Sequence, residues 1–132
     1  MQSNRELTQS IYDAFAKGDP GPLFGAMHPE CNWKEAENHP YADQNPFIGA
    51  PRIGEGVFGR LMADFDGFTV TMNKLVAEGD TVVGLGRYTG THKRTGKRLD
   101  AQFAHGWVFR GGQLVDFQQY TDTAQYQQVA KA

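Results

Sequence analysis

The chain has 132 residues, of which 39% are apolar and 12% aromatic, which is enough to bury a core and too many for a disordered chain. Its net charge of −2 gives no general attraction to nucleic acid or anionic membranes, and no apolar run approaches the ~20 residues that cross a bilayer. The single cysteine, Cys31, excludes an intramolecular disulfide and a multi-cysteine zinc site. We therefore expect one domain, residues 1–132, in a soluble cytoplasmic protein that binds neither nucleic acid nor membrane.

Two helices are predicted at the start of the chain. Ser3 and Glu6 have the spacing of a capping box, and apolar residues then recur at helical spacing over residues 7–15. A second helix starts at Asp19-Pro20 and runs to about Met27. Because these two helices cannot bury their apolar faces alone, we expect them to lie across a sheet.

One strand, a long loop and a third helix are predicted next. Residues 31–37 alternate in character, which favours a strand with Trp33 and Glu35 on one face. Residues 38–52 contain three prolines and read as an irregular loop, a type of segment that often rims a site. Residues 54–65 return to helical spacing with an apolar stripe.

From residue 67 onward the pattern is strand after strand, which predicts a four-stranded antiparallel meander. Glycine-containing turns separate the strands, and residues 125–129 form a last helical turn. Helices followed by strands argue for an α+β fold. We expect a cone-shaped, strongly curved, mainly antiparallel sheet, with three to four helices weighted toward the N-terminus enclosing an apolar pocket.

The last hairpin gathers reactive side chains. Gly111-Gly112 accepts the positive φ angles of a tight turn, so Arg110 should pair with Gln113. Counting outward with alternating faces places six side chains together: Phe103, His105, Trp107, Gln118, Tyr120 and Asp122. The same counting along the preceding hairpin adds Arg87 to that face, unless a β-bulge reverses the parity. An imidazole, a phenol and a carboxylate among aromatic rings have the composition of a small-molecule pocket.

Six motifs spread over nearly the whole chain match one known family. They are AFAKGD at 14–19, WKE at 33–35, residues 49–56, GDTVV at 79–83, FAHGW at 103–107 and QYTDT at 119–123. On these residues the chain resembles the SnoaL-like branch of the nuclear transport factor 2-like superfamily, often described as ketosteroid isomerase-related proteins. The resemblance implies a homodimeric α+β cone with a deep apolar pocket and no cofactor. Its members include isomerases, cyclases, dehydratases, epoxide hydrolases and non-catalytic binding domains.

The resemblance also implies site residues. In polyketide-cyclase relatives a strand histidine and a pocket aspartate near the end of the last strand do acid–base work, and His105 and Asp122 hold those positions. Our leading hypothesis is a cofactor-independent isomerase, cyclase or dehydratase that acts next to a carbonyl of a small hydrophobic oxygenated molecule. Asp122 would take the proton, while His105, together with Tyr120 or Arg87, would stabilise the oxyanion. The expected substrate-binding residues are Trp33, Glu35, Tyr12, Phe58, Phe103, Trp107, Arg87 and Gln118, and no metal site is expected.

Structural explanations stand beside these roles. Asp122 also suits the N-cap of the last helical turn, and His105 and Tyr120 also suit hydrogen-bonded positions in the core. Glu35 and Arg87 would neutralise each other if both lay inside. Two other functions use the same fold: a non-catalytic protein that binds a small ligand in the same pocket, and a scaffold whose exposed sheet face forms a dimer.

Overall fold

A curved, unclosed six-stranded sheet forms the frame of the protein in this computed structural model, which describes residues 2–132. Its strands are β1 (Met27–Lys34), β2 (Phe47–Ile48), β3 (Phe65–Glu78), β4 (Thr81–His92), β5 (Arg98–Arg110) and β6 (Gln113–Thr121). The spatial order is β2-β1-β6-β5-β4-β3. Strands β3 to β6 form the predicted antiparallel meander, and β1 joins β6 in parallel. The α+β fold class is therefore confirmed.

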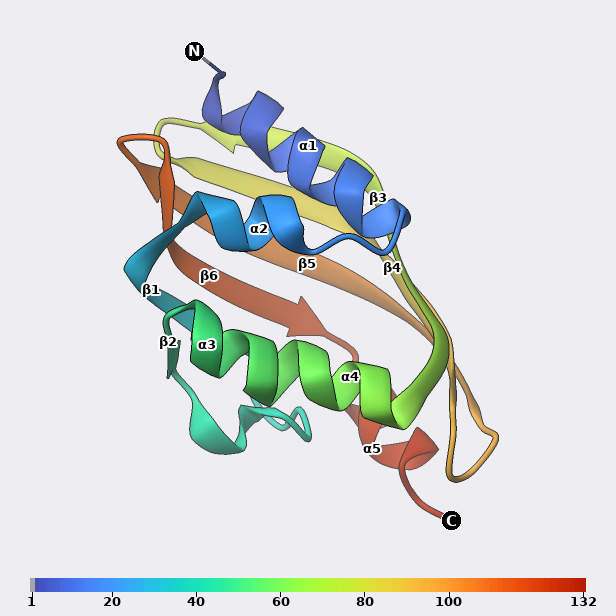
Figure 1. Cartoon of the computed structure of the whole chain (residues 1–132). Coiled ribbons are helices and arrows are strands. Elements are labelled where there is room, and N and C mark those ends of the chain that lie inside the picture. The colour runs from blue at the N-terminus through green and yellow to red at the C-terminus, as the bar shows by residue number, and fades with distance from the viewer. Residues whose placement is uncertain (1) are drawn as a thin grey trace.

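The helices lie mainly on one side of the sheet (Figure 1). They are α1 (Asn4–Ala16), α2 (Gly21–Ala26), α3 (Ala50–Ile53), α4 (Gly59–Asp64) and α5 (Thr123–Val129), with a short 3-10 turn at Ala42–Gln44. A π-helical stretch, Gly54–Phe58, joins α3 to α4, so the three segments form one continuous helix. Among the described residues, no helix combines the length and apolar character needed to cross a membrane.

The helix ends follow local chemistry. Ser3 and Glu6 form both hydrogen bonds of the predicted capping box. The third helix begins at Ala50 instead of residue 54, because Pro51 occupies the first turn, where its missing N–H costs nothing. Strand β1 ends at Lys34 instead of residue 37, so Glu35 lies just beyond the strand.

The last hairpin turns where the sequence predicts and then departs from the expected register. Gly111 and Gly112 have φ angles of 58° and 78°, and Arg110 pairs with Gln113 as expected. Beyond them Phe109 pairs with Leu114 but Val108 pairs with Asp116, so Val115 is an extra residue in a β-bulge.

The bulge reverses which face of β6 points inward. His105 pairs with Gln119 and Trp107 with Phe117, so the expected pairs with Gln118 and Asp116 are wrong. The predicted position of Arg87 is also wrong, because Arg87 pairs with Gln102 and lies on the outer face.

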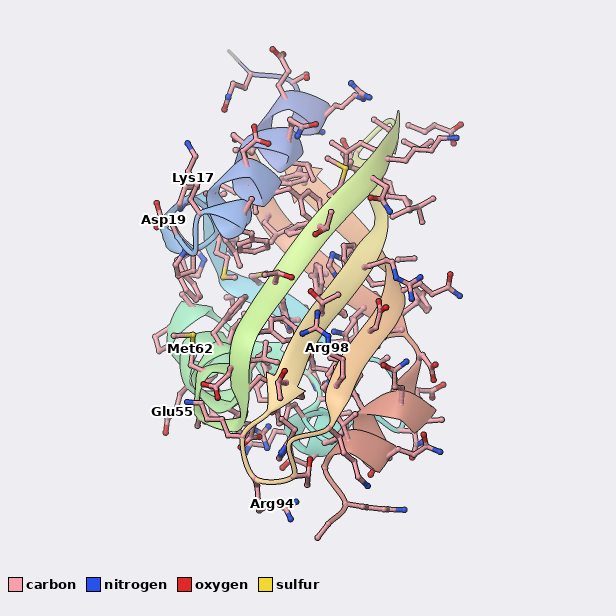
Figure 2. All side chains as sticks on the ribbon, turned by 90° about the vertical axis from the view of Figure 1, so that its right-hand side faces the viewer. Lys17, Asp19, Glu55, Met62, Arg94 and Arg98 are labelled. Atoms are coloured by element: carbon pink, nitrogen blue, oxygen red, sulfur yellow. The ribbon has the colours of Figure 1, made fainter. Side chains whose placement is uncertain are left out.

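The tip of the β4–β5 hairpin fixes the C-terminal ends of two helices. Lys93 Nζ donates to the Met62 carbonyl of α4, and Lys97 Nζ to the Gln128 carbonyl of α5. Arg94, at the tip in Figure 2, donates to the carbonyl of Ala130 just after α5. Cations at helix C-termini complement the helix dipole, so this tip holds α5 against the sheet.

Candidate functional site

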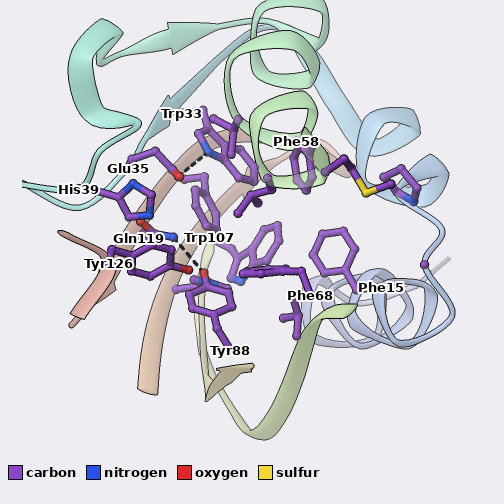
Figure 3. A pocket seen from close by; sticks show the side chains of 18 residues that line it. Phe15, Trp33, Glu35, His39, Phe58, Phe68, Tyr88, Trp107, Gln119 and Tyr126 are labelled. Atoms are coloured by element: carbon purple, nitrogen blue, oxygen red, sulfur yellow. Dashed lines mark hydrogen bonds between the residues drawn. The ribbon is translucent and has the colours of Figure 1, made fainter. Parts of the chain in front are cut away.

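A cavity of about 250 Å³ lies between the helices and the inner face of the sheet (Figure 3). Much of its wall is aromatic, formed by Phe15, Trp33, Phe58, Phe68, Trp107 and Phe117. The polar side chains that line it are Glu35, His39, Tyr88, His105, Gln119 and Tyr126. This combination of apolar walls with a few polar groups is typical of small-molecule sites.

Glu35 contributes the carboxyl group of the cavity wall and is only 2% exposed. Its backbone N–H donates to Oδ1 of Asn45, and Nδ2 of Asn45 donates to the Glu35 carbonyl, which fixes the residue just after β1. The indole N–H of Trp33 donates to Glu35 Oε2 at 3.0 Å. Burial raises the pKa of Glu35 to about 7, although the Trp33 hydrogen bond and the charge of Arg60 act in the opposite direction.

His39 lies beside this carboxyl group at the cavity wall (Figure 3). Its ring packs against the rings of Tyr41 and Tyr126, with centroids 5.0 and 4.2 Å away. Burial lowers the pKa of His39 to about 4, so its imidazole is neutral at pH 7. Nδ1 accepts a hydrogen bond from the backbone N–H of Tyr41, so the proton of the neutral ring is on Nε2.

His105 is buried and hydrogen-bonded through both ring nitrogens. Nδ1 lies 2.7 Å from the Tyr12 hydroxyl, and Nε2 is hydrogen-bonded to the Tyr88 hydroxyl. Trp107 Nε1 donates to the Tyr12 hydroxyl at 2.9 Å, while Gln119 Nε2 donates to the Tyr88 hydroxyl at 3.0 Å. Burial lowers the pKa of His105 to about 3, so this imidazole is neutral at pH 7.

The expectation that Asp122 and Tyr120 share the cavity with His105 is wrong. Asp122 is the exposed N-cap of α5, and its Oδ1 accepts a 3.2 Å hydrogen bond from the backbone N–H of Gln125. Tyr120 is 61% exposed on the outer face of β6, since the bulge at Val115 turns it away from the cavity.

The expected substrate-binding residues divide into three groups. Those that line the cavity are Trp33, Glu35, Phe58 and Trp107. Tyr12 and Phe103 are buried directly behind the wall, where each contacts His105. Arg87 and Gln118 lie outside the cavity: Arg87 pairs with Asp100 at 2.9 Å, and Gln118 is half-buried.

Four polar lining residues, His39, Tyr88, Gln119 and Tyr126, are absent from the sequence-based set. The apolar residues Leu114 and Phe117 are three positions apart, which signals a one-residue bulge that brings Gln119 inward. Tyr126 reaches the cavity because α5 folds back against β5, a long-range contact with no local signal.

Comparisons with known proteins agree with this architecture. The family model described as "SnoaL-like domain" matches residues 8–117. No curated protein matches the chain. Among solved structures, an NTF2-like protein from Burkholderia thailandensis E264 is 34% identical and covers 100% of both chains, with a TM-score of 0.95.

Two more distant structures share the fold. TerC, co-crystallised with polyporic acid, is 20% identical over 96% of this chain and 97% of its own, with a TM-score of 0.82. A putative SnoaL-like polyketide cyclase from Jannaschia sp. CCS1 is 18% identical over 98% of this chain and 95% of its own, with a TM-score of 0.74. At these identities the similarity concerns the fold alone.

Proposed function

The chain belongs to the SnoaL-like domain family. From the cavity in its fold we propose that it is a cofactor-independent acid–base enzyme, which transfers a proton at the carbon next to a carbonyl group. Its substrate would be a small, apolar, oxygenated molecule, and the reaction an isomerisation, cyclisation or dehydration. The observation that carries the proposal is the buried carboxyl group of Glu35 in a largely aromatic cavity wall.

Glu35 takes the role of general base that the sequence pattern predicts for Asp122. With a pKa of about 7, its carboxyl group exists in both protonation states near neutral pH. It can therefore remove a proton from the carbon next to a carbonyl and return that proton to another atom of the same molecule. A general base whose pKa lies near the working pH typically accelerates such a step by about 10²- to 10⁴-fold.

The size and lining of the cavity limit the substrate. An apolar cavity of about 150 Å³ holds a benzene molecule, so about 250 Å³ suits a compound of one or two rings. The rings of Trp33, Phe58 and Trp107 line the cavity and pack edge-on against one another. Aromatic walls of this kind favour a planar ring system as the substrate. The polar end of the molecule would lie near Glu35 and Tyr88.

Two structural neighbours are compatible with this proposal. One is described as a putative SnoaL-like polyketide cyclase, and TerC was crystallised with polyporic acid. One description names a putative cyclase and the other a co-crystallised small molecule, and both support the proposal. The assignment to this chain rests on Glu35.

Hydrogen–deuterium exchange tests the proposal without knowledge of the product. Indanone, a bicyclic ketone with acidic protons next to its carbonyl, is incubated with the protein in heavy water, and its deuteration is followed by NMR. We expect the wild type to accelerate exchange and Glu35→Gln to lose at least about a hundredfold of that rate. Glu37→Gln is the matched control, because Glu37 is an exposed carboxylate two residues further along. Equal rates for the wild type and Glu35→Gln would overturn the proposal.

The alternative function is a binding protein without turnover, which the predominantly aromatic wall also favours. Such a protein would bind indanone with similar affinity in the wild type and in Glu35→Gln. It would not accelerate exchange in either. Binding measured beside exchange therefore separates the two functions.

A further inference from the structure

We infer that His105 is a positioning residue that orients the Tyr88 hydroxyl, so that its proton is offered to a ketone or enolate oxygen in the cavity. This inference rests on the proposed function for the identity of the oxygen. The orientation itself follows from a chain of hydrogen bonds with a donor-only group at each end.

The first end of the chain is the indole of Trp107. Its N–H can only donate, so the Tyr12 hydroxyl accepts at 2.9 Å and keeps its own proton for another partner. Nδ1 of His105 lies 2.7 Å from that hydroxyl. If Tyr12 donates to Nδ1, the proton of the neutral imidazole is on Nε2, and Nε2 donates to the Tyr88 hydroxyl.

The second end is the backbone N–H of Ala36. It also can only donate, so the atom of Gln119 that faces it at 3.1 Å is the carbonyl oxygen. The NH₂ group of Gln119 is thereby turned toward Tyr88, to which it donates at 3.0 Å. The orientation of this amide is therefore fixed by the backbone.

Both ends of the chain meet at the Tyr88 oxygen, which accepts from His105 and from Gln119. The one proton of the Tyr88 hydroxyl then has no acceptor among the residues of this hydrogen-bond chain. Tyr88 lines the cavity, so the proton is available to a molecule bound there (Figure 3). Burial raises the pKa of Tyr88 well above its ordinary value, so the hydroxyl keeps this proton at neutral pH.

The opposite tautomer of His105 leaves a buried group unsatisfied. With the proton on Nδ1, the Tyr12 hydroxyl would accept twice, and its own proton would lack a partner in a residue only 3% exposed. With the proton on Nε2 the unpartnered proton is instead that of Tyr88, which lines the cavity and can donate to a molecule bound there. Tyr12 does not line the cavity, so its proton would stay unsatisfied, and Nε2 protonation is therefore favoured. Tyr12 thus takes part without lining the cavity.

NMR of the histidine ring nitrogens tests the orientation on the unmodified protein. The His105 signals are assigned through their proximity to the rings of Tyr12 and Phe103. We expect a proton on Nε2 and none on Nδ1, unchanged between about pH 5 and about pH 8. A proton on Nδ1, or on both nitrogens, would overturn the inference, whatever the activity of Glu35.

Binding of a matched pair of probes tests the offered proton. Indanone and indane share one carbon framework, but only indanone carries an acceptor oxygen. We expect the wild type to prefer indanone by on the order of tenfold, Tyr88→Phe to lose this preference and Tyr12→Phe to weaken it. The exposed Tyr120→Phe is the control and should keep the preference. Equal affinity of the wild type for both probes, or binding of neither, would overturn the inference, whereas failure of the exchange assay alone would count only against Glu35.

Discussion

The indole N–H of Trp33 donates a 3.0 Å hydrogen bond to the carboxyl group of Glu35, two residues further along the chain. This bond favours the ionised carboxylate, whereas burial disfavours it, and burial has the larger effect. Trp33 therefore limits how far the pKa of Glu35 rises. The same indole ring stacks on Phe117 with centroids 3.7 Å apart. The Trp33 side chain therefore forms part of the cavity wall and also lowers the pKa of Glu35.

Replacing Trp33 by phenylalanine should raise the pKa of Glu35 further, because the stack on Phe117 is kept while the hydrogen bond to the carboxylate is lost. The base form of Glu35 then appears at higher pH. We expect the pH at half-maximal exchange rate to increase by on the order of one unit. The pH profile of indanone deuteration measures this shift. An unchanged or lowered midpoint would contradict the role of Trp33.

Stability should depend on pH through Glu35 in the direction opposite to that of most carboxyl groups. Its pKa is about 7 in the folded protein and near 4.5 in the unfolded chain, so the folded state binds the proton more tightly between these values. The contribution of Glu35 to the unfolding free energy is therefore largest below about pH 4.5 and is lost as the pH rises through about 7.

The amide in Glu35→Gln does not ionise and removes this dependence. Relative to the variant, the wild type should lose up to about 3 kcal/mol of unfolding free energy between pH 5 and pH 8. Urea unfolding of both proteins at the two pH values measures the difference, which cancels effects of other groups. A difference that is the same at both pH values would show that Glu35 has an ordinary pKa.

Asp122 should matter for stability and not for chemistry. Its carboxylate caps α5, so Asp122→Ala should lower the unfolding free energy by about 1 kcal/mol. Exchange activity should stay within about twofold of the wild type at a temperature where both are folded. Loss of activity with unchanged stability would indicate that Asp122, and not Glu35, is the general base.

Gly84 should not tolerate a side chain, although it lies in a regular strand. A Cβ atom there would overlap the phenol of Tyr12, whose Cζ is 2.8 Å from the position that the Cβ would occupy. We expect Gly84→Ala to cost about 1–3 kcal/mol and to weaken the preference for indanone over indane. At Gly106 the nearest atom to an added Cβ is 3.9 Å away, so Gly106→Ala is the control. Equal thermal stability of the two variants would contradict this packing.

The sequence is sufficient for the strand order of the meander and for one face of β5, because alternation along a regular strand is local information. Phe103, His105 and Trp107 do share the inner face. The face of β6 that points inward depends on Val115, a single extra residue that counting outward from the turn does not include. Its only sign in the sequence is the three-residue spacing of Leu114 and Phe117. Because of that one residue, Phe117 and Gln119 line the cavity, where Gln118 and Tyr120 were expected.

The surroundings of Glu35 could not be predicted from the sequence either. Its alternation with Trp33 indicates a shared inward face, and both residues are buried as expected. The expected partner, Arg87, instead lies outside with Asp100. Whether a buried carboxyl group is neutralised or left with a raised pKa depends on contacts between distant segments, and these follow from the register of the whole sheet.

The titration of the Glu35 side-chain carboxyl carbon by NMR tests the account most directly, with Glu35→Gln identifying the signal. We expect a midpoint near pH 7, far above the ordinary value of a glutamate. A midpoint near the ordinary value of 4.5 would mean that the cavity holds no carboxyl group suited to proton transfer at neutral pH.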